Sequence, residues 1–176
     1  MKFHPLRIPG AFLIEIETIS DDRGFFARSW CNQEFTDRGL NAKISQCSLS
    51  FNHKKGTLRG MHYQAAPHEE AKLVRCTQGA IYDVLLDLRP TSPRYCTWIA
   101  EELSAQNHHA LFIPEGVAHG FQTLTDDVEV FYQISEAYHA ELSRGVRWDD
   151  PAFNIAWPED DRTLSDRDRQ YPDYLR

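Results

Sequence analysis

The chain has 176 residues, 41% of them hydrophobic, which predicts one domain (residues 1–176) with a full core. Its formal net charge of −7 excludes a general positive field for holding nucleic acid, so we expect any phosphorylated ligand to need a local basic cluster. It has no apolar segment of signal-peptide or membrane-spanning length and no C-x-x-C pair, which predicts a cytoplasmic protein with reduced thiols and no membrane partner. The candidate phosphate-binding cations are Arg23, Arg28, Arg59 and Lys72.

Seven segments alternate apolar and polar residues and are rich in β-branched and aromatic types, a pattern that predicts strands. Turn-like residues separate them, as in an all-β sandwich or barrel. A short helix is predicted over residues 32–40, capped by Asn32 and closed by Gly39. The charged residues from Pro158 onward favour a frayed tail on composition alone. The predicted strands are 12–18, 44–51, 72–77, 80–87, 97–103, 110–113 and 128–134.

The second predicted strand has one polar face, formed by alternate residues from Gln46 to Asn52 that include Ser48 and Ser50. This face either meets solvent or lines a wet cavity, and without other information the solvent interpretation is favoured.

The residues from Gly56 to Gly79 have the spacing of the first metal motif of the cupins, but they lack its ligands. That motif supplies two imidazoles and a carboxylate, whereas here only His62 remains. Gln64 stands at the second His position and Lys72 at the carboxylate position. Because an ammonium has no lone pair and repels a cation, we predict no metal at this site.

A second motif, P-x-G-x-x-H, runs from Pro114 to His119, and the two motifs together predict a cupin-type jelly-roll β-barrel with a few short peripheral helices. A satisfied core histidine is the less favoured alternative for His119. Arg59 and His62 would lie on opposite faces of a regular strand. Gly60 between them permits a bulge that turns both toward one pocket.

Over nearly its full length the chain resembles the dTDP-4-dehydrorhamnose 3,5-epimerase family of nucleotide-sugar enzymes. The resemblance implies a cupin jelly roll, a homodimer with exchanged N-terminal strands, and no cofactor. Its substrate would be a nucleotide-diphosphate sugar. The matching stretches are D-D-R-G-F-F from Asp21, L-R-G-M-H-Y-Q from Leu58, K-L-V from Lys72, D-V-L-L-D-L-R from Asp83, I-P-E-G-V-A-H-G-F from Ile113, V-F-Y from Val130, W-D-D-P from Trp148 and I-A-W-P from Ile155.

The resemblance also implies catalytic roles. A 4-keto sugar has acidified hydrogens at C3 and C5, so the reaction needs a base, an electrophile near O4 and an acid on the opposite face. His62 would be the base with Asp168 as its partner, Lys72 the cationic stabiliser of O4, and Tyr132 the acid. From the residues alone, Asp161 and Asp166 are as eligible as Asp168, and Tyr132 is more often a packing aromatic in such a strand.

Several positions where the nucleotide would bind depart from the family pattern. Arg28 replaces a Glu, Gln46-Cys47-Ser48 replaces Q-D-N, and Arg167 replaces a Lys. These changes bear on the nucleotide base and the exact sugar rather than on proton transfer. The predicted substrate-binding residues are Arg23, Phe26, Arg28, Gln46, Ser48, Arg59, His119, Tyr138 and Arg167.

We therefore expect a metal-independent 3,5-epimerase of a nucleotide-linked 4-keto-6-deoxyhexose, most simply dTDP-4-dehydro-6-deoxyglucose, serving deoxysugar synthesis. A C3- or C5-only epimerase, or one that uses another nucleotide, fits the sequence as well. A cupin that binds sugar nucleotides without turnover would be expected to lose His62 or Tyr132, and both are present. A metal-dependent isomerase or dioxygenase would find poor ligands in Gln64 and Lys72.

Overall fold

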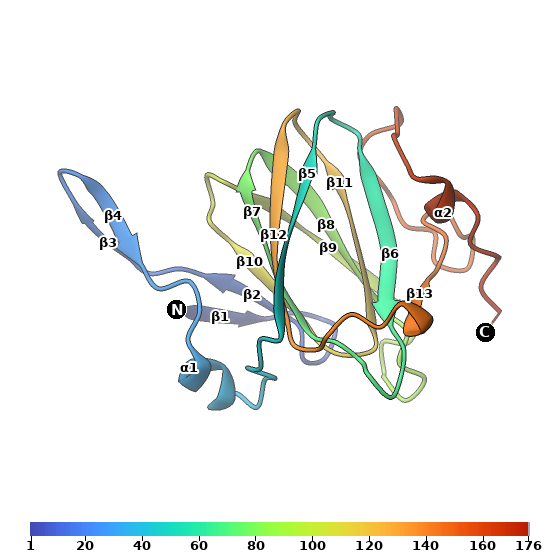
Figure 1. Cartoon of the computed structure of the whole chain (residues 1–176), viewed down its shortest axis with the longest axis horizontal. Helices are drawn as coiled ribbons and strands as arrows, with labels where there is room; N and C mark the ends of the chain where they lie inside the picture. Colours follow the sequence, from blue (N-terminus) through green and yellow to red (C-terminus); the bar gives the residue numbers. More distant parts are fainter. Residues whose placement is uncertain (176) are drawn as a thin grey trace.

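The alternating segments form two antiparallel sheets that face each other across a barrel, as the computed structural model shows for residues 1–175 (Figure 1). The six-stranded sheet has the order β1-β2-β10-β7-β12-β5, and the five-stranded sheet has the order β13-β6-β11-β8-β9. A separate hairpin pairs β3 with β4. The strands are β1 Lys2–Pro5, β2 Phe12–Glu15, β3 Thr18–Asp21, β4 Gly24–Ala27, β5 Gln46–Asn52, β6 Leu58–Gln64, β7 Lys72–Gln78, β8 Ala80–Asp87, β9 Trp98–Ser104, β10 Ala110–Ile113, β11 Val117–Thr123, β12 Val128–Ile134 and β13 Ser143–Gly145.

The predicted all-β jelly roll is confirmed, and β8, β10 and β12 have the bounds expected from alternation. The pattern missed β6 and β11, because both carry glycines that interrupt the period-2 signal. The predicted strand 12–18 also runs three residues past the end of β2 and includes only the first residue of β3. The chain leaves the sheet after Glu15, and β3 pairs only with β4 in the part of the chain described.

The short helices lie at the edges of the barrel. Helix α1 (Asn32–Thr36) has Cys31 rather than Asn32 at its N-cap, so the predicted cap was one residue late. Gly39, with φ of +69°, follows its end as expected. The buried Phe35 packs against Phe3 and Phe112, with ring centroids 5.2 and 5.7 Å apart. The others are the 3₁₀ turn η1 (Ala140–Leu142) and α2 (Asp166–Arg169); no helix within residues 1–175 is long and apolar enough to cross a membrane.

The frayed tail expected from Pro158 onward is wrong, because that segment is bonded to the five-stranded sheet: the backbone of Glu159 exchanges two hydrogen bonds with the side chain of Gln122, and the carbonyl of Thr163 accepts the N–H of Leu58. The residues just before it are anchored as well. Phe153, Ile155 and Trp157 are buried in one apolar cluster with residues of β6, β8 and β11. The Trp157 indole N–H donates to the carbonyl of Trp148 at 2.9 Å. Beyond this cluster, the chain continues to α2, which lies beside β6 (Figure 1). The charged residues near the C-terminus thus follow a buried apolar segment that holds this part of the chain on the sheet.

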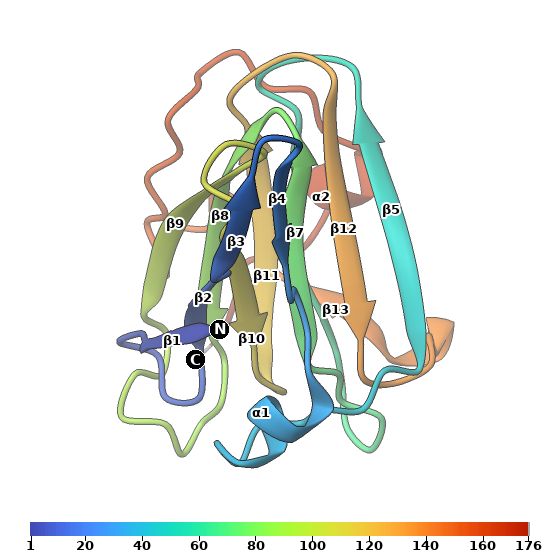
Figure 2. The same ribbon diagram turned by 90° about the vertical axis from the view of Figure 1, so that its left-hand side faces the viewer.

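The β3–β4 hairpin projects away from the barrel (Figures 1 and 2). Its side chains Ile19, Phe25 and Phe26 are 74%, 49% and 74% exposed. Three large apolar side chains are therefore exposed together on one protruding hairpin.

The five-stranded sheet contains the bulge that the sequence predicted. His62 pairs with His119 and Arg59 with Phe121, so three residues of β6 span the distance of two in β11. Gly60 lies within this bulge with φ of +138°, where a Cβ would lie 2.5 Å from the Cα of Gly120. The extra residue turns Arg59 and His62 toward the same cavity.

We predict that Gly60→Ala lowers the free energy of unfolding by roughly 2–5 kcal/mol, from backbone strain and overpacking together. Gly39→Ala is the control, because Gly39 also has a positive φ but has no atom within 4 Å of an added Cβ. It should cost about 1–2 kcal/mol, the conformational term alone. Urea unfolding of wild type and the two variants measures both changes in the free energy of unfolding. Equal losses in the two variants would refute the close approach of Gly60 to Gly120 as the source of the larger cost.

Candidate active site

A cavity of about 660 Å³ lies between the two sheets. Its walls combine β5, β7 and β12 of the six-stranded sheet with β6 and β11 of the five-stranded sheet, and α2 closes one side. The structure brings ten of the thirteen predicted site residues to this cavity: Gln46, Ser48, Arg59, His62, Lys72, His119, Tyr132, Tyr138, Arg167 and Asp168. Arg23, Phe26 and Arg28 do not line it.

His62 and Asp168 form an ion pair in the cavity wall, with 2.6 Å between His62 Nε2 and Asp168 Oδ1. Burial by itself would raise the pKa of the Asp168 carboxyl, but hydrogen bonds and the charge of His62 lower it below the usual value. The carboxylate therefore stays ionised at neutral pH and fixes the orientation of the imidazole. The structure thus selects Asp168, which is buried, over Asp161 and Asp166, which are exposed.

Local sequence explains why Asp168 reaches His62. Ser165 is the N-cap of α2, and its hydroxyl accepts the Asp168 backbone N–H at 3.2 Å. Arg167 then donates from Nε to the Tyr171 hydroxyl and from a terminal nitrogen to Ser143 Oγ, both at 2.8 Å. The S-x-x-D cap and the arginine together hold this short helix against the barrel.

Tyr132 reaches the cavity from β12, in the sheet opposite His62. Burial raises the pKa of its phenol, and the negative charge of Asp83 raises it further. Tyr132 therefore remains a protonated donor throughout the neutral range.

His119 lies on the cavity wall but is also paired inside the barrel. Its Nε2 is 2.5 Å from Oδ1 of the fully buried Asp83, and its ring meets Tyr132 edge to face at 6.0 Å. The core and site interpretations of this histidine are thus both partly correct. Within residues 1–175 the second oxygen of Asp83 has no hydrogen-bond partner.

Lys72 enters the cavity from β7 and forms an ion pair with Glu70, Nζ to Oε1, at 2.8 Å. Both side chains are nearly buried. The paired carboxylate fixes the position of the ammonium and offsets the cost of its burial, since an unpaired buried cation is strongly disfavoured.

The polar face of β5 lines the cavity rather than bulk solvent, so the favoured solvent interpretation was wrong. Gln46, Ser48 and Ser50 contribute to the wall. Buried Asn52, one step further along this face, accepts a hydrogen bond of 2.7 Å from Nε of Arg59. The strand thereby both lines the cavity and positions one of its cations.

The three predicted residues outside the cavity belong to the hairpin and the segment after it. Arg23 pairs with Asp21 in the hairpin turn, and Arg28 pairs with Glu34 of α1 at 3.1 Å. Phe26 is largely exposed. Within one chain, these residues cannot contact a ligand in the cavity.

The sequence reasoning missed the partners of two predicted residues. Glu70 precedes Lys72 by two positions, so an E-x-K pattern at the start of a strand was the available signal. Asp83 is an acidic residue inside the apolar strand A-I-Y-D-V-L-L-D, and such a residue calls for a buried partner.

Gln64 stands at a metal-ligand position of the cupins but has a structural role here. It is buried, and its side-chain nitrogen donates to the carbonyls of His68 and Ala137 at 2.6 and 3.0 Å. Its oxygen accepts the backbone N–H of His139 at 2.8 Å. The side chain therefore ties two loops together and does not line the cavity.

A jelly-roll barrel with a polar cavity between its sheets defines a cupin-type protein. A family model described as dTDP-4-dehydrorhamnose 3,5-epimerase matches residues 5–175. The chain belongs to the dTDP-4-dehydrorhamnose 3,5-epimerase family.

Individual relatives agree with this assignment. The dTDP-4-dehydrorhamnose 3,5-epimerase of Shigella flexneri is 40% identical over 92% of this chain and 89% of its own length. The crystal structure of the Bacillus anthracis enzyme with TDP and PPi bound has a TM-score of 0.95 at 39% identity, covering 98% of this chain and 99% of that one. A 3'-monoepimerase from Streptomyces bikiniensis, in complex with dTDP-quinovose, has a TM-score of 0.90 at 34% identity, covering 97% and 86%.

We predict that the Tyr132 phenol does not ionise up to about pH 11, above the usual tyrosine value of about 10, because burial and Asp83 raise its pKa. Phenolate absorbance of the wild type and of Tyr132→Phe should then rise in parallel over this range. An additional phenol ionising near pH 10 in the wild type alone would contradict the prediction.

Proposed function

We propose that the chain epimerises dTDP-4-dehydro-6-deoxyglucose at C3 and C5 to dTDP-4-dehydrorhamnose, without a metal. The observation that carries this proposal is the placement of His62 and Tyr132 on opposite sheets, facing one cavity that also holds the ammonium of Lys72. Inversion at carbon requires proton removal from one face and proton delivery to the other, and the two sheets supply these two groups.

His62 is the proposed base. Its Nδ1 or Nε2 must be free to take the proton, and the 2.6 Å contact of Nε2 with Asp168 leaves Nδ1 for the substrate. Once protonated, the imidazolium is stabilised by the adjacent carboxylate. The C–H electron pair moves into a C=C bond, and the O4 carbonyl becomes an enolate oxygen.

Lys72 stabilises that enolate oxygen. A fixed ammonium supplies the positive charge that a metal would supply in other cupins, at the same position of the motif. The ion pair with Glu70 holds the ammonium in place before the negative charge develops.

Tyr132 delivers the proton to the opposite face of the enolate, which restores the carbonyl and inverts the carbon. Its raised pKa suits it to donate only when a strong base such as an enolate carbon accepts. A second cycle at the other carbon uses the same groups, because C3 and C5 both flank the O4 carbonyl.

The nucleotide diphosphate is assigned to the open side of the cavity. Arg59 and Arg167 provide planar guanidinium groups suited to phosphate oxygens, and Tyr138, 58% exposed, provides an aromatic face for the base. Ser48, which replaces the family Asn, lies in this part of the proposed site, so the change concerns which nucleotide or sugar is accepted. Arg28, which replaces the family Glu, would reach the substrate only from a second protomer.

The proposal includes a homodimer in which the hairpin of one protomer completes the site of the other. This arrangement covers the exposed side chains of Ile19, Phe25 and Phe26, and exposed Leu49 and Phe51 on β5 offer an apolar surface to receive them. In this dimer, Arg23, Phe26 and Arg28 would contact the substrate bound in the cavity of the other protomer.

The decisive experiment follows deuterium incorporation at C3 and C5 by NMR. Chelator-treated enzyme is incubated with dTDP-4-dehydro-6-deoxyglucose in D₂O. Wild type should incorporate deuterium at both carbons, whereas His62→Ala should lose exchange by about 10²–10⁴-fold, the usual contribution of a general base. Tyr132→Phe should retain proton removal better than completed inversion, because only delivery is lost.

Near-normal exchange in His62→Ala would refute the base assignment. Incorporation at one carbon would make the chain a monoepimerase, the activity named for the Streptomyces bikiniensis relative. Binding of the nucleotide sugar with no exchange at either carbon would leave a binding protein, and activity lost on chelation would indicate a metal enzyme.

We predict that two inactive variants, His62→Ala and Arg23→Ala, regain activity when they are unfolded, mixed and refolded together. In a mixed dimer, one of the two sites combines an intact barrel with an intact hairpin. Random pairing makes about half of the dimers mixed, so about a quarter of all sites, and of wild-type turnover, is restored. Each variant refolded alone is the control. No recovery from a mixture that sedimentation shows to be dimeric would contradict completion of the site by the partner's hairpin.

A further inference from the structure

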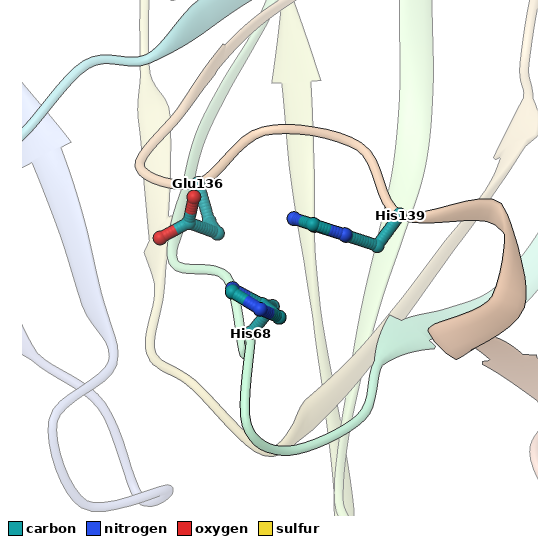
Figure 3. Close-up of side chains that lie close together, drawn as sticks. All are labelled: His68, Glu136 and His139. Atoms are coloured by element: carbon teal, nitrogen blue, oxygen red, sulfur yellow. The ribbon is translucent and has the colours of Figure 1, made fainter.

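A cluster of metal-ligand side chains lies outside the substrate cavity. His68, Glu136 and His139 each offer one ligand atom, and these atoms lie within 4.8 Å of one another. All three are half-buried, and none lines the cavity. Figure 3 shows the tip of the His139 ring pointing toward Glu136, with His68 on the neighbouring loop. We propose that these three side chains bind a divalent transition-metal ion, preferentially Zn²⁺.

The backbone that carries the ligands is already fixed without an ion. The buried amide of Gln64 bonds the carbonyls of His68 and Ala137 and the N–H of His139. The His68 and His139 rings stack at 4.0 Å with 14° between their planes. One buried side chain therefore sets the spacing of the two loops, so little ordering entropy is left for an ion to offset.

His139 and Glu136 each have a hydrogen-bond partner that leaves a metal-binding atom available. Glu141 lies 3.2 Å from Nδ1 of His139, which leaves Nε2 with its lone pair toward the cluster. A carboxylate on the second ring nitrogen is the arrangement that orients metal-binding histidines. Glu136 accepts the backbone N–H of Ala137 at 2.9 Å, which fixes its carboxylate.

Two imidazoles and one carboxylate match the ligand preference of zinc, which takes a fourth ligand from water. In a tetrahedral site, ligand atoms about 2.1 Å from the ion lie roughly 3.3 Å from one another, so the ligand atoms must approach by about 1–2 Å. One imidazole must also rotate out of the stack, because nearly parallel rings direct their in-plane lone pairs along parallel planes. The hard cations Mg²⁺ and Ca²⁺ prefer all-oxygen sites and fit it poorly.

Lys43 competes for the same carboxylate. Its ammonium lies 3.2 Å from Glu136 Oε2, and its side chain is 58% exposed. Such a pair is weak because water screens it, so an ion bound by three ligands can displace it. Removing this competing cation should therefore strengthen metal binding, which is the opposite of the effect of removing a ligand.

The site lies next to the substrate cavity in the sequence as well as in space. Tyr138, which lines the cavity, is flanked by the backbone of Ala137 and His139. A bound ion would restrain the loop on both sides of this aromatic ring without contacting the reacting groups. Turnover of the chelated enzyme is therefore no measure of the site, and binding must be measured directly.

The test is a Zn²⁺ titration of the chelator-treated full-length protein, in competition with a chromophoric chelator. The visible spectrum of the Co²⁺ form reports the coordination geometry. Wild type should bind one equivalent with a tetrahedral Co²⁺ spectrum. His68→Ala and His139→Ala should each weaken binding by more than about 100-fold, beyond the loss typical of an outer-shell partner. Lys43→Met should bind more tightly.

His53→Ala is the matched control, since His53 is an exposed histidine 3.9 Å from the carboxylate of Asp127. It should bind as wild type does. The proposal is overturned if wild type does not bind, if both ligand variants retain wild-type affinity, if His53→Ala loses as much as they do, or if Lys43→Met weakens binding. Thermal unfolding of the metal-free variants checks that each one is folded.

Discussion

The site depends on the close approach of β6 and β11 at Gly60 and Gly120. A side chain at either glycine would collide with the opposite strand, as shown by the 2.5 Å distance from a Cβ on Gly60 to the Cα of Gly120. Because the strands approach so closely, β6 accommodates an extra residue as a bulge, and Arg59 and His62 turn to the same side. A regular strand would have sent one of them into the outer apolar layer. The position of the proposed base thus follows from two residues that have no side chains.

Around this constraint the barrel interior is polar but nearly neutral. Three titratable groups of the cavity have an anionic partner: Asp168 for His62, Glu70 for Lys72 and Asp83 for His119. Pairing reduces the cost of burying charge and fixes each group in one orientation. A metal-binding cupin places its charge on one ion held by four side chains. In this chain the charge is distributed over several pairs, and this arrangement can serve as separate base, electrophile and acid.

The ligand positions that the cupin motif leaves unused have acquired other roles. Lys72 contributes a fixed charge, and Gln64 clamps the loops that carry His68 and His139. The same clamp organises the proposed zinc cluster, so a residue that no longer coordinates an ion inside the barrel positions ligands outside it. The β3–β4 hairpin contributes no residue to the cavity of its own chain. Its exposed apolar side chains and its basic residues are both accounted for if a second protomer receives it.

The sequence by itself determined the strands with clean alternation and the paired cupin motifs, because these depend on local periodicity and spacing. It determined ten of the cavity residues only through the resemblance of its motifs to one family. Residue chemistry left Asp161, Asp166 and Asp168 locally equivalent, and the tertiary structure shows that Asp168, the one that the resemblance implied, meets His62. The tertiary structure also turned the polar face of β5 inward and anchored the C-terminal segment through Trp157, outcomes that depend on contacts between distant parts of the chain. Periodicity shows which residues share a face, but only the packing of the second sheet decides what that face meets.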